Sequence, residues 1–208
     1  MAVWKTKTKS KTESSPVQSS PILFLDRDGV VIRDKDYLAD PAGVELLPGV
    51  AEAMIKARAA GFQIVGVSNQ SGIGRGYFSV CDFDAVMIKL AADLAELGAW
   101  FDGFFYCPHG PDDGCACRKP GIGLLAEAAA HFHWNAAASW IVGDKGSDVA
   151  LGQKAGLGSV LVSTGYGAQE AAAVKRRWSG ADRVFVAADL AAAVDLICNQ
   201  AAGAPEGP

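Results

Sequence analysis

Residues 21–30 read Pro-Ile-Leu-Phe-Leu-Asp-Arg-Asp-Gly-Val, and this stretch decides the fold class. Its apolar run is short and uninterrupted, which is typical of a strand that is buried on both faces of a parallel sheet. The run stops at Asp26, and Asp28 and Gly29 follow within three residues. We therefore expect a central strand that delivers two carboxylates to one edge of a sheet.

The rest of the chain alternates between strand patterns and helix patterns. This alternation predicts a mainly parallel, Rossmann-like sheet covered by helices on both faces, which is a three-layer α/β/α sandwich, with no large cap domain. The expected strands cover residues 22–25, 63–67, 104–106, 139–142, 159–162 and 183–186, and the expected helices cover residues 49–60, 79–97, 122–133, 147–155 and 190–197.

Polar residues interrupt this pattern where the expected strands end. Asp26 and Asp28 follow the first strand, Ser68-Asn69 follows the second, and Asp144 and Asp148 follow the fourth. Parallel α/β sheets bind their ligands at the carboxyl ends of the strands. The sequence therefore predicts one site that gathers acidic groups from distant parts of the chain.

Charge is distributed unevenly along the 208 residues. The formal net charge is −4, although the first twenty residues carry four Lys and only one Glu, so the remainder is more acidic still. An acidic body is unsuited to general nucleic-acid binding, which requires a basic surface. We expect residues 1–20 to form a disordered tail rather than a basic interaction arm, residues 21–199 to form a single domain, and residues 200–208 to form a frayed tail.

Targeting features are missing from the sequence pattern. No apolar run approaches the ~20 residues that span a bilayer. The lysines between Lys5 and Lys11 alternate with polar residues and precede no apolar segment of the kind found in signal peptides. We expect a cytoplasmic protein without a membrane partner, in which the five cysteines stay reduced.

The Asp26-Arg-Asp28-Gly29 motif could carry nucleophilic chemistry. Residues two apart in an extended segment share a face, so both carboxylates can point into one pocket. Asp26 could attack phosphorus and form an aspartyl-phosphate. Asp28 could protonate the leaving oxygen and later activate water. An ordinary turn is the alternative, because D-x-D-G alone has low specificity.

Gly143-Asp144-Lys-Gly-Ser-Asp148 adds two carboxylates that would repel Asp26 unless a cation lay between them. Mg²⁺ binds oxygen ligands and commonly combines one or two carboxylates with phosphate and water. The sequence thus favours a magnesium site. The alternative is that Asp144 caps the following helix.

The segment from Ser68 to Gly76 reads Ser-Asn-Gln-Ser-Gly-Ile-Gly-Arg-Gly. Its hydroxyls and exposed backbone N–H groups suit a phosphate. The pattern fits neither the P-loop nor the dinucleotide fingerprint, which excludes those nucleotide-binding motifs. A plain connecting loop is the alternative.

Cys107-Pro-His109-x₅-Cys115-Ala-Cys117 places three thiols and one imidazole within eleven residues. Such a Cys₃His set is a common tetrahedral ligand set of structural Zn²⁺. Buried reduced cysteines beside an unrelated histidine are the alternative.

The zinc-bound loop would fix two cations at the mouth of the site, because Arg118 and Lys119 follow directly. Arg can grip a phosphate with two N–H groups, whereas Lys acts as a point charge. The remaining candidates lack partners at useful spacing and are expected to be structural or on the surface: Cys81, His131, His133 and Cys198.

These motifs, in this order, resemble the haloacid dehalogenase (HAD) superfamily of phosphatases, and the match covers residues 22–197. The C-P-H…C-x-C-R-K-P stretch together with S-N-Q-S-G-I-G-R-G is similar to the zinc-containing branch, which holds heptose-bisphosphate phosphatases and the histidinol-phosphatase domain. The resemblance implies a magnesium-dependent phosphoric monoester hydrolase with the HAD fold.

The resemblance also implies a role for each site residue. Asp26 would be the nucleophile and Asp28 the general acid/base, while Ser68 and Lys119 would steady the phosphoryl group. Magnesium would be held by the Asp26 carboxylate, the Asp28 carbonyl and Asp144, with Asp148 in support. Zinc would play a structural role. The residues expected to contact substrate are Asp34, Tyr37, Asn69, Gln70, Ser71, Arg118 and Lys145.

Two features of the sequence indicate different substrates. The loop from Asn69 to Gly76 and the Asp36-Tyr37-Leu38 segment resemble the heptose branch, whereas the five residues between His109 and Cys115 resemble the histidinol-phosphate branch. We give more weight to the loop, because substrate contacts it directly. The hypothesis is hydrolysis of D-glycero-D-manno-heptose 1,7-bisphosphate at the 7-phosphate by a monomer, and histidinol phosphate is the alternative substrate.

Two other classes of protein share some of these features. A phospho-Asp receiver domain also phosphorylates an aspartate on a parallel α/β fold, but it needs a long-lived phosphate, which Asp28 would help to hydrolyse. A zinc-ribbon nucleic-acid binder conflicts with the acidic body and with a single compact cysteine cluster.

Overall fold

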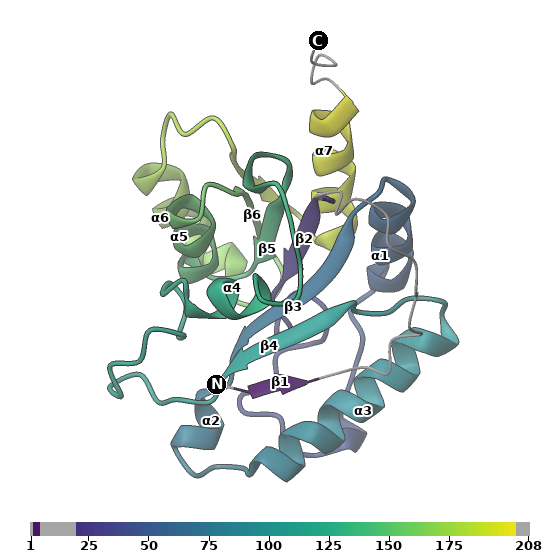
Figure 1. Cartoon of the computed structure of the whole chain (residues 1–208), viewed down its shortest axis with the longest axis vertical. Coiled ribbons are helices and arrows are strands. Elements are labelled where there is room, and N and C mark those ends of the chain that lie inside the picture. Colours follow the sequence, from purple (N-terminus) through teal and green to yellow (C-terminus); the bar gives the residue numbers. More distant parts are fainter. Residues whose placement is uncertain (1, 5–19, 203–208) are drawn as a thin grey trace.

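The computed structural model describes residues 2–4 and 20–202, and its core is one seven-stranded sheet (Figure 1). The strand order is β1-β4-β3-β2-β5-β6-β7, and every pairing is parallel except that of β1 with β4. The strands are β1 (Ala2–Trp4), β2 (Ile22–Leu25), β3 (Gln63–Asn69), β4 (Gly103–Cys107), β5 (Trp140–Gly143), β6 (Gly158–Val162) and β7 (Val184–Ala187).

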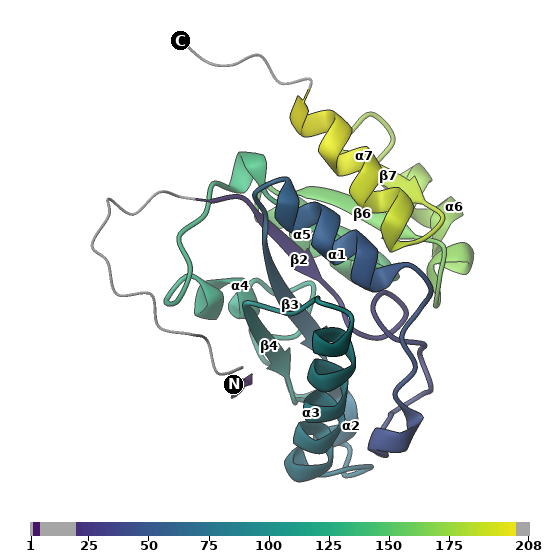
Figure 2. The same ribbon diagram turned by 90° about the vertical axis from the view of Figure 1, so that its right-hand side faces the viewer.

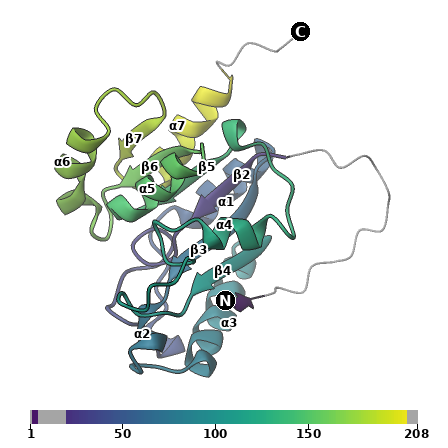
Figure 3. The same ribbon diagram turned by 60° about the vertical axis from the view of Figure 1, so that its left-hand side comes forward.

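Helices cover both faces of this sheet. Figure 2 shows α1, α3 and α7 on one face, and Figure 3 shows α4, α5 and α6 on the other. The α-helices are α1 (Val50–Ala59), α2 (Ser71–Gly74), α3 (Val80–Glu96), α4 (Gly123–Ala128), α5 (Gly146–Lys154), α6 (Gly167–Arg177) and α7 (Leu190–Ala202), and the 3₁₀ turns are η1 (Pro41–Gly43) and η2 (Ala136–Ala138).

The central strand β2 explains the three layers. All four of its residues are buried, and their side chains alternate between two hydrophobic clusters. Leu23 and Leu25 belong to the cluster under α1, α3 and α7, whereas Ile22 and Phe24 belong to the cluster under α4 and α5. The expected α/β/α sandwich is confirmed.

Several elements differ from the sequence-based expectation, and three of them show the physical reason. Ala2–Trp4 was expected to lie in a disordered tail but pairs with β4, whose outer edge would otherwise leave N–H and C=O groups free. Helix α6 was not predicted, because only Gly167 and Val174 are buried in it and the rest of its sequence consists mainly of Ala and charged residues. Helix α4 is shorter than expected, since Phe132 and Trp134 turn inward and pack on the core.

The remaining tail predictions fall on residues 1, 5–19 and 203–208, which lie outside the described residues. Helix α7 continues to Ala202, past the predicted end at residue 197. Within residues 2–4 and 20–202, no helix combines the length and the apolar character needed to cross a bilayer.

Candidate active site

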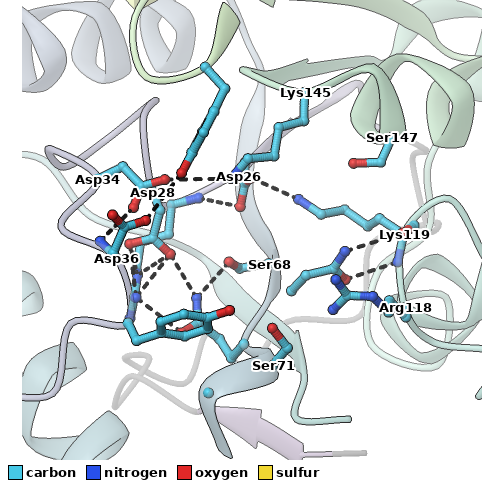
Figure 4. A pocket seen from close by; sticks show the side chains of 16 residues that line it. Asp26, Asp28, Asp34, Asp36, Ser68, Ser71, Arg118, Lys119, Lys145 and Ser147 are labelled. Carbon is cyan, nitrogen blue, oxygen red and sulfur yellow. Dashed lines mark hydrogen bonds and ion pairs between the residues drawn. The ribbon is translucent and has the colours of Figure 1, made fainter. Parts of the chain in front are cut away.

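The carboxyl ends of β2, β3 and β5 surround a cavity of about 300 Å³ (Figure 4). Every residue that was predicted to contact substrate lies in its wall, together with Asp26, Asp28, Ser68 and Lys119. The complete lining is Asp26, Arg27, Asp28, Asp34, Asp36, Tyr37, Ser68, Asn69, Gln70, Ser71, Gly72, Arg118, Lys119, Lys145, Ser147 and Tyr166.

Three buried carboxylates form the acidic cluster at the base of this cavity: Asp26, Asp144 and Asp148. One oxygen from each lies within 4.8 Å of the others. Asp26 directly follows β2, Asp144 follows β5, and Asp148 lies on the first turn of α5. The structure thus brings together Asp26, Asp144 and Asp148 as predicted, whereas Asp28, the fourth carboxylate of the prediction, is not part of the cluster.

Lys119 neutralises part of the acidic cluster. Its Nζ lies 3.0 Å from Asp26 Oδ2 and 2.6 Å from Asp148 Oδ1, and it donates a 2.8 Å hydrogen bond to the Val67 carbonyl. Burial alone would lower the pKa of Lys119, but the two carboxylates raise it above its usual value. The prediction that Lys119 lies at the mouth of the site is wrong, because its side chain is almost fully buried at the base.

Asp144 has an environment that suits a cation. Its Oδ2 accepts the Tyr166 backbone N–H at 2.9 Å, whereas its buried Oδ1 has no hydrogen-bond partner among the described residues. Burial, and next the charge of Asp26, raise the pKa of Asp144 to about 7. An ion bound at Oδ1 would satisfy the orphaned oxygen and hold the carboxyl ionised. The oxygen-only donor set of the acidic cluster therefore fits Mg²⁺.

Two glycines leave the space that Asp144 occupies. A Cβ on Gly29 would lie 2.4 Å from Asp144 Oδ2, and a Cβ on Gly165 would lie 2.3 Å from the same atom. Both glycines have positive φ, 78° and 55°, which side-chain-bearing residues rarely adopt. The Asp144 carboxylate thus packs against the backbone of both glycines, and a side chain at either position would displace it.

Asp148 anchors the first turn of α5. Its Oδ2 accepts the backbone N–H of Lys145 at 3.1 Å, and a Cβ on Gly143 would clash with its carboxylate. The alternative in which Asp144 caps this helix is therefore wrong, because Asp148 supplies the contact. Capping leaves Asp148 Oδ1 free to face Lys119.

The loop after β3 supports the site. Asn69 Oδ1 accepts the Lys119 backbone N–H at 2.9 Å, and its Nδ2 donates to the Lys119 carbonyl at 3.2 Å. Ser68 is buried, and its hydroxyl accepts a hydrogen bond from Gln70 Nε2 at 2.9 Å. Asn69 therefore fixes the segment that carries Lys119, while Ser71 and Gly72 line the cavity on short helix α2.

Asp28 lies beside Asp26 but is held by different partners. Arg27 and Gln70 both donate to its carboxylate, at distances of 2.8–3.2 Å. Gln70 was predicted to contact substrate, and no role was predicted for Arg27. Arg27 lies between Asp26 and Asp28 at the end of a buried strand, and this position could have indicated that it pairs with a carboxylate.

The outer wall of the cavity is formed largely by the segment after β2 and by Tyr166. Lys145 Nζ lies 3.5 Å from Asp34 Oδ2 and 4.4 Å from the centroid of the Tyr166 ring. The Tyr166 hydroxyl donates to Asp36 Oδ1 at 3.1 Å. Asp36 and Tyr37 have φ values of 45° and 65°, an uncommon backbone conformation for residues with side chains. Tyr166 was missed because it lies outside every motif, and Ser147 was missed because the Gly143-to-Asp148 motif was interpreted only through its carboxylates.

Arg118 brings a partly unpaired cation to the same cavity. Its Nη1 is buried and has no hydrogen-bond partner among the described residues. The cavity wall has a second cation that is not fully buried, Lys145. Together they give an acidic site two positive groups that can meet a second anionic group of a ligand.

The thiol cluster lies beside this cavity and consists of Cys107, His109, Cys115 and Cys117, whose ligand atoms are all within 4.8 Å of one another. The three thiol sulfurs lie 3.2–3.5 Å apart, and His109 Nδ1 lies 3.2 Å from Cys117 Sγ. Tetrahedral Zn²⁺ with Zn–S of ~2.3 Å needs a similarly compact set. The four donors therefore fit zinc, as the sequence predicted.

The thiol cluster also contacts the loop after β3. The backbone N–H of Gly74 donates to the Pro108 carbonyl at 2.7 Å, and that of Gln70 donates to the Cys107 carbonyl at 2.8 Å. A Cβ on Gly74 would lie 2.8 Å from the Pro108 oxygen, so the two segments are in close contact. The loop of the thiol cluster is thus hydrogen-bonded to the loop after β3, which in turn holds the Lys119 backbone through Asn69.

Comparisons with known proteins agree with this geometry. The HAD-hydrolase-like family model matches residues 116–193. The chain is 40% identical over 147 residues to the D-glycero-beta-D-manno-heptose-1,7-bisphosphate 7-phosphatase of Pseudomonas putida, which covers 70% of this chain and 84% of the relative. The enzyme of the same name from Escherichia coli K12 is 39% identical over 156 residues, 71% of this chain and 82% of the relative.

Solved structures give the same result. The crystal structure of D,D-heptose 1,7-bisphosphate phosphatase from B. bronchiseptica, complexed with magnesium and phosphate, is 36% identical with a TM-score of 0.77, over 86% of this chain and 99% of that one. A putative HAD-like phosphatase from Mesorhizobium loti is 37% identical with a TM-score of 0.69, over 77% and 79%. The chain therefore belongs to the HAD-like hydrolases and, among them, to the family of the D-glycero-D-manno-heptose-1,7-bisphosphate 7-phosphatases.

Proposed function

We propose that this protein hydrolyses D-glycero-β-D-manno-heptose 1,7-bisphosphate to heptose 1-phosphate and phosphate through a phosphoryl group carried on Asp26. The observation that carries the proposal is the buried Asp26 carboxylate at the base of a polar cavity, 3.0 Å from Lys119 and beside Asp144 and Asp148. The names of the relatives supply the substrate.

Magnesium would be held by the Asp26 carboxylate, the Asp28 carbonyl and Asp144, with Asp148 in support. When bound, it would neutralise the crowded carboxylates and offset the charge of the substrate phosphate. The orphaned Asp144 Oδ1 is the feature of the described chain that favours this assignment. The magnesium and phosphate in the related crystal structure support it further.

In the first step, a carboxylate oxygen of Asp26 attacks phosphorus, and the bond between phosphorus and the sugar oxygen breaks. Asp28 gives its proton to the departing oxygen. Lys119 and the Ser68 hydroxyl steady the phosphoryl oxygens, and both groups already converge on the cavity. In the second step, Asp28 takes a proton from water, the water oxygen attacks phosphorus, and the bond to Asp26 breaks.

The distal part of the substrate would meet the outer wall. Arg118 and Lys145 are suited to the 1-phosphate, because Arg118 Nη1 lacks a partner and the Lys145 side chain is partly exposed. Asp34 and Tyr37 would contact the sugar hydroxyls and ring. Every proposed group belongs to one chain, so a monomer would suffice.

Zinc would have a structural role. Four protein donors complete a tetrahedral set and leave no position for water. Such a site would hold the loop that carries Arg118 and Lys119. The thiolates require reduced cysteines, which is consistent with a cytoplasmic setting.

Histidinol phosphate is the second candidate substrate, favoured by the five residues between His109 and Cys115. Purified protein should be assayed with Mg²⁺ on both substrates, with ³¹P NMR to identify the phosphate that is released. We expect loss of the 7-phosphate from the heptose bisphosphate at a higher kcat/KM than for histidinol phosphate. The reverse preference would contradict the proposed substrate but keep the chemistry.

A further inference from the structure

Arg27 is a fully buried cation that the chemistry above does not use. Its side chain is only 1% exposed, and the guanidinium carbon lies 5.5 Å from the centre of the Phe83 ring. Its Nη1 lies 3.9 Å from the Met87 sulfur, also on α3. Burying a charge is costly unless it is paired, so the partners of Arg27 indicate its purpose.

The principal partner of Arg27 is Asp28. Nε and Nη2 of the guanidinium both contact the Asp28 carboxylate, at 3.1 and 2.9 Å from Oδ1, and Nη2 also lies 2.9 Å from Oδ2. Two N–H groups on a rigid plane fix the orientation of a carboxylate as well as its position. Gln70 bonds to both groups: its Oε1 accepts from Arg27 at 3.1 Å, and its Nε2 donates to Asp28 at 2.8 Å.

The main chain of Arg27 is fixed independently of its side chain. Its carbonyl accepts N–H groups from Val31 at 2.9 Å and Ile32 at 3.0 Å, which closes the turn after β2. Its own N–H donates to Asp26 Oδ1 at 2.7 Å. A substitution at position 27 would therefore keep the Asp26 contact and the turn, and would change only what the side chain does to Asp28.

We propose that Arg27 is a positioning residue that, with Gln70, holds the Asp28 carboxyl group in the orientation in which its protonated form delivers the proton to the leaving oxygen. This inference rests on the general-acid role proposed for Asp28. A residue that only filled space between β2 and α3 would not need a two-pronged contact with a carboxylate. Because Lys cannot reproduce that contact, the inference also predicts that retaining the charge alone is insufficient.

The first test uses the dependence on the leaving group. Arg27→Met and Arg27→Lys should be assayed with Mg²⁺ on heptose 1,7-bisphosphate and on p-nitrophenyl phosphate, whose leaving group departs without a proton. We expect kcat/KM for the sugar phosphate to fall about 10–100-fold in both variants, and that for the aryl phosphate to fall less than about threefold. Equal losses on the two substrates would overturn the inference.

The second test measures coupling. In an Asp28→Asn background, adding Arg27→Met should lower kcat/KM less than about twofold further, because the group that Arg27 orients is already lost. Multiplying effects would indicate a purely structural role. Met87→Leu is the matched packing control and should leave kcat unchanged, and thermal unfolding reports whether each variant folds. If Arg27→Met fails to fold, Arg27→Lys still tests the inference. A wild-type protein that hydrolyses neither substrate would reject the proposed function instead.

Discussion

The acidic cluster and the thiol cluster have similar dimensions but are assembled in opposite ways. The carboxylates of the acidic cluster come from residues 26 to 148 and depend on two neighbouring strands for their convergence. The ligands of the thiol cluster lie between residues 107 and 117 and need little more than a loop. One is therefore a product of the fold, and the other can be recognised in the sequence.

The surroundings of the two clusters differ as well. The acidic cluster faces the cavity through Asp26, contacts the Lys119 ammonium, and leaves Asp144 Oδ1 without a hydrogen bond, with Lys145 Nζ 4.0 Å away. None of the four residues of the thiol cluster lines that cavity. A cation in the acidic cluster would meet substrate, whereas a cation in the thiol cluster would be shielded by its own ligands. Lys119 connects them, because it follows Cys117 by two residues yet lies between Asp26 and Asp148.

The largest expected loss of activity comes from a substitution in the acidic cluster. Asp26→Asn keeps the shape of the side chain but removes the nucleophile, so kcat should fall by more than about 10⁴-fold. Phosphate release measures the loss, and metal analysis should still find about one zinc per chain. Substantial remaining turnover would contradict the covalent route, and lost zinc would contradict the independence of the two clusters.

The same contrast explains how much the sequence could predict. Local patterns sufficed for the thiol cluster and for β2, because both are continuous in the chain. The convergence of Asp26 and Asp144 could also be predicted, since parallel strands end at one edge. The depth of Lys119 could not, because spacing alone does not reveal that Asn69 pins its backbone from across the sheet edge.

Residues outside the motifs escaped prediction for the same physical reason. Tyr166 reaches the cavity from the segment after β6. Its hydrogen-bond partners Asp36 and Asp144 are separated from it by 130 and 22 positions in the sequence. Arg27 lay inside a motif, between two carboxylates, but the direction of its side chain, which folds back under α3, could not be predicted from the sequence. Side-chain direction, rather than element position, was the missing information.

The next largest effect concerns the thiol cluster. Cys115→Ser should lose zinc and loosen the loop, so that Lys119 and Arg118 are misplaced and kcat/KM falls about 100-fold. Thermal unfolding should also occur at a lower temperature. Cys81→Ser, at an exposed cysteine on α3, is the matched control and should change neither property. Full activity in a zinc-free Cys115→Ser protein would remove the link between the clusters.

A smaller effect tests whether packing positions the magnesium ligand. Gly165→Ala puts a methyl group against Asp144 Oδ2 and the Gly29 backbone, so Mg²⁺ affinity should fall about tenfold. Gly156→Ala is the matched control, because its φ is also positive, 70°, but a Cβ there meets nothing within 4 Å. Both variants should lose about 1 kcal/mol of stability from backbone strain. Activity titrated with Mg²⁺ should separate them, and identical titration curves would indicate that Asp144 tolerates displacement.

The smallest effect is a pH dependence that only the acidic cluster should produce. Burial raises the pKa of Asp144 from its ordinary value of 3.8 to about 7 in the metal-free protein. Between these values the folded protein holds a proton that the unfolded chain has released, so this group lowers the free energy of unfolding as pH rises towards 7. Above that pH the carboxylate is ionised in both states, and Mg²⁺ binds without displacing a proton.

Mg²⁺ should therefore raise the Tm more at a pH of about 8 than at about 5.5, by a difference of a few degrees. Asp144→Asn should remove most of this difference, because the amide cannot ionise. Zinc bound by the thiol cluster should contribute nothing to it, since Mg²⁺ prefers oxygen ligands and does not compete for thiolates. An equal Mg²⁺-induced shift at both pH values would mean that the acidic cluster is already ionised at pH 5.5, and the missing hydrogen bond at Asp144 Oδ1 would then need another explanation.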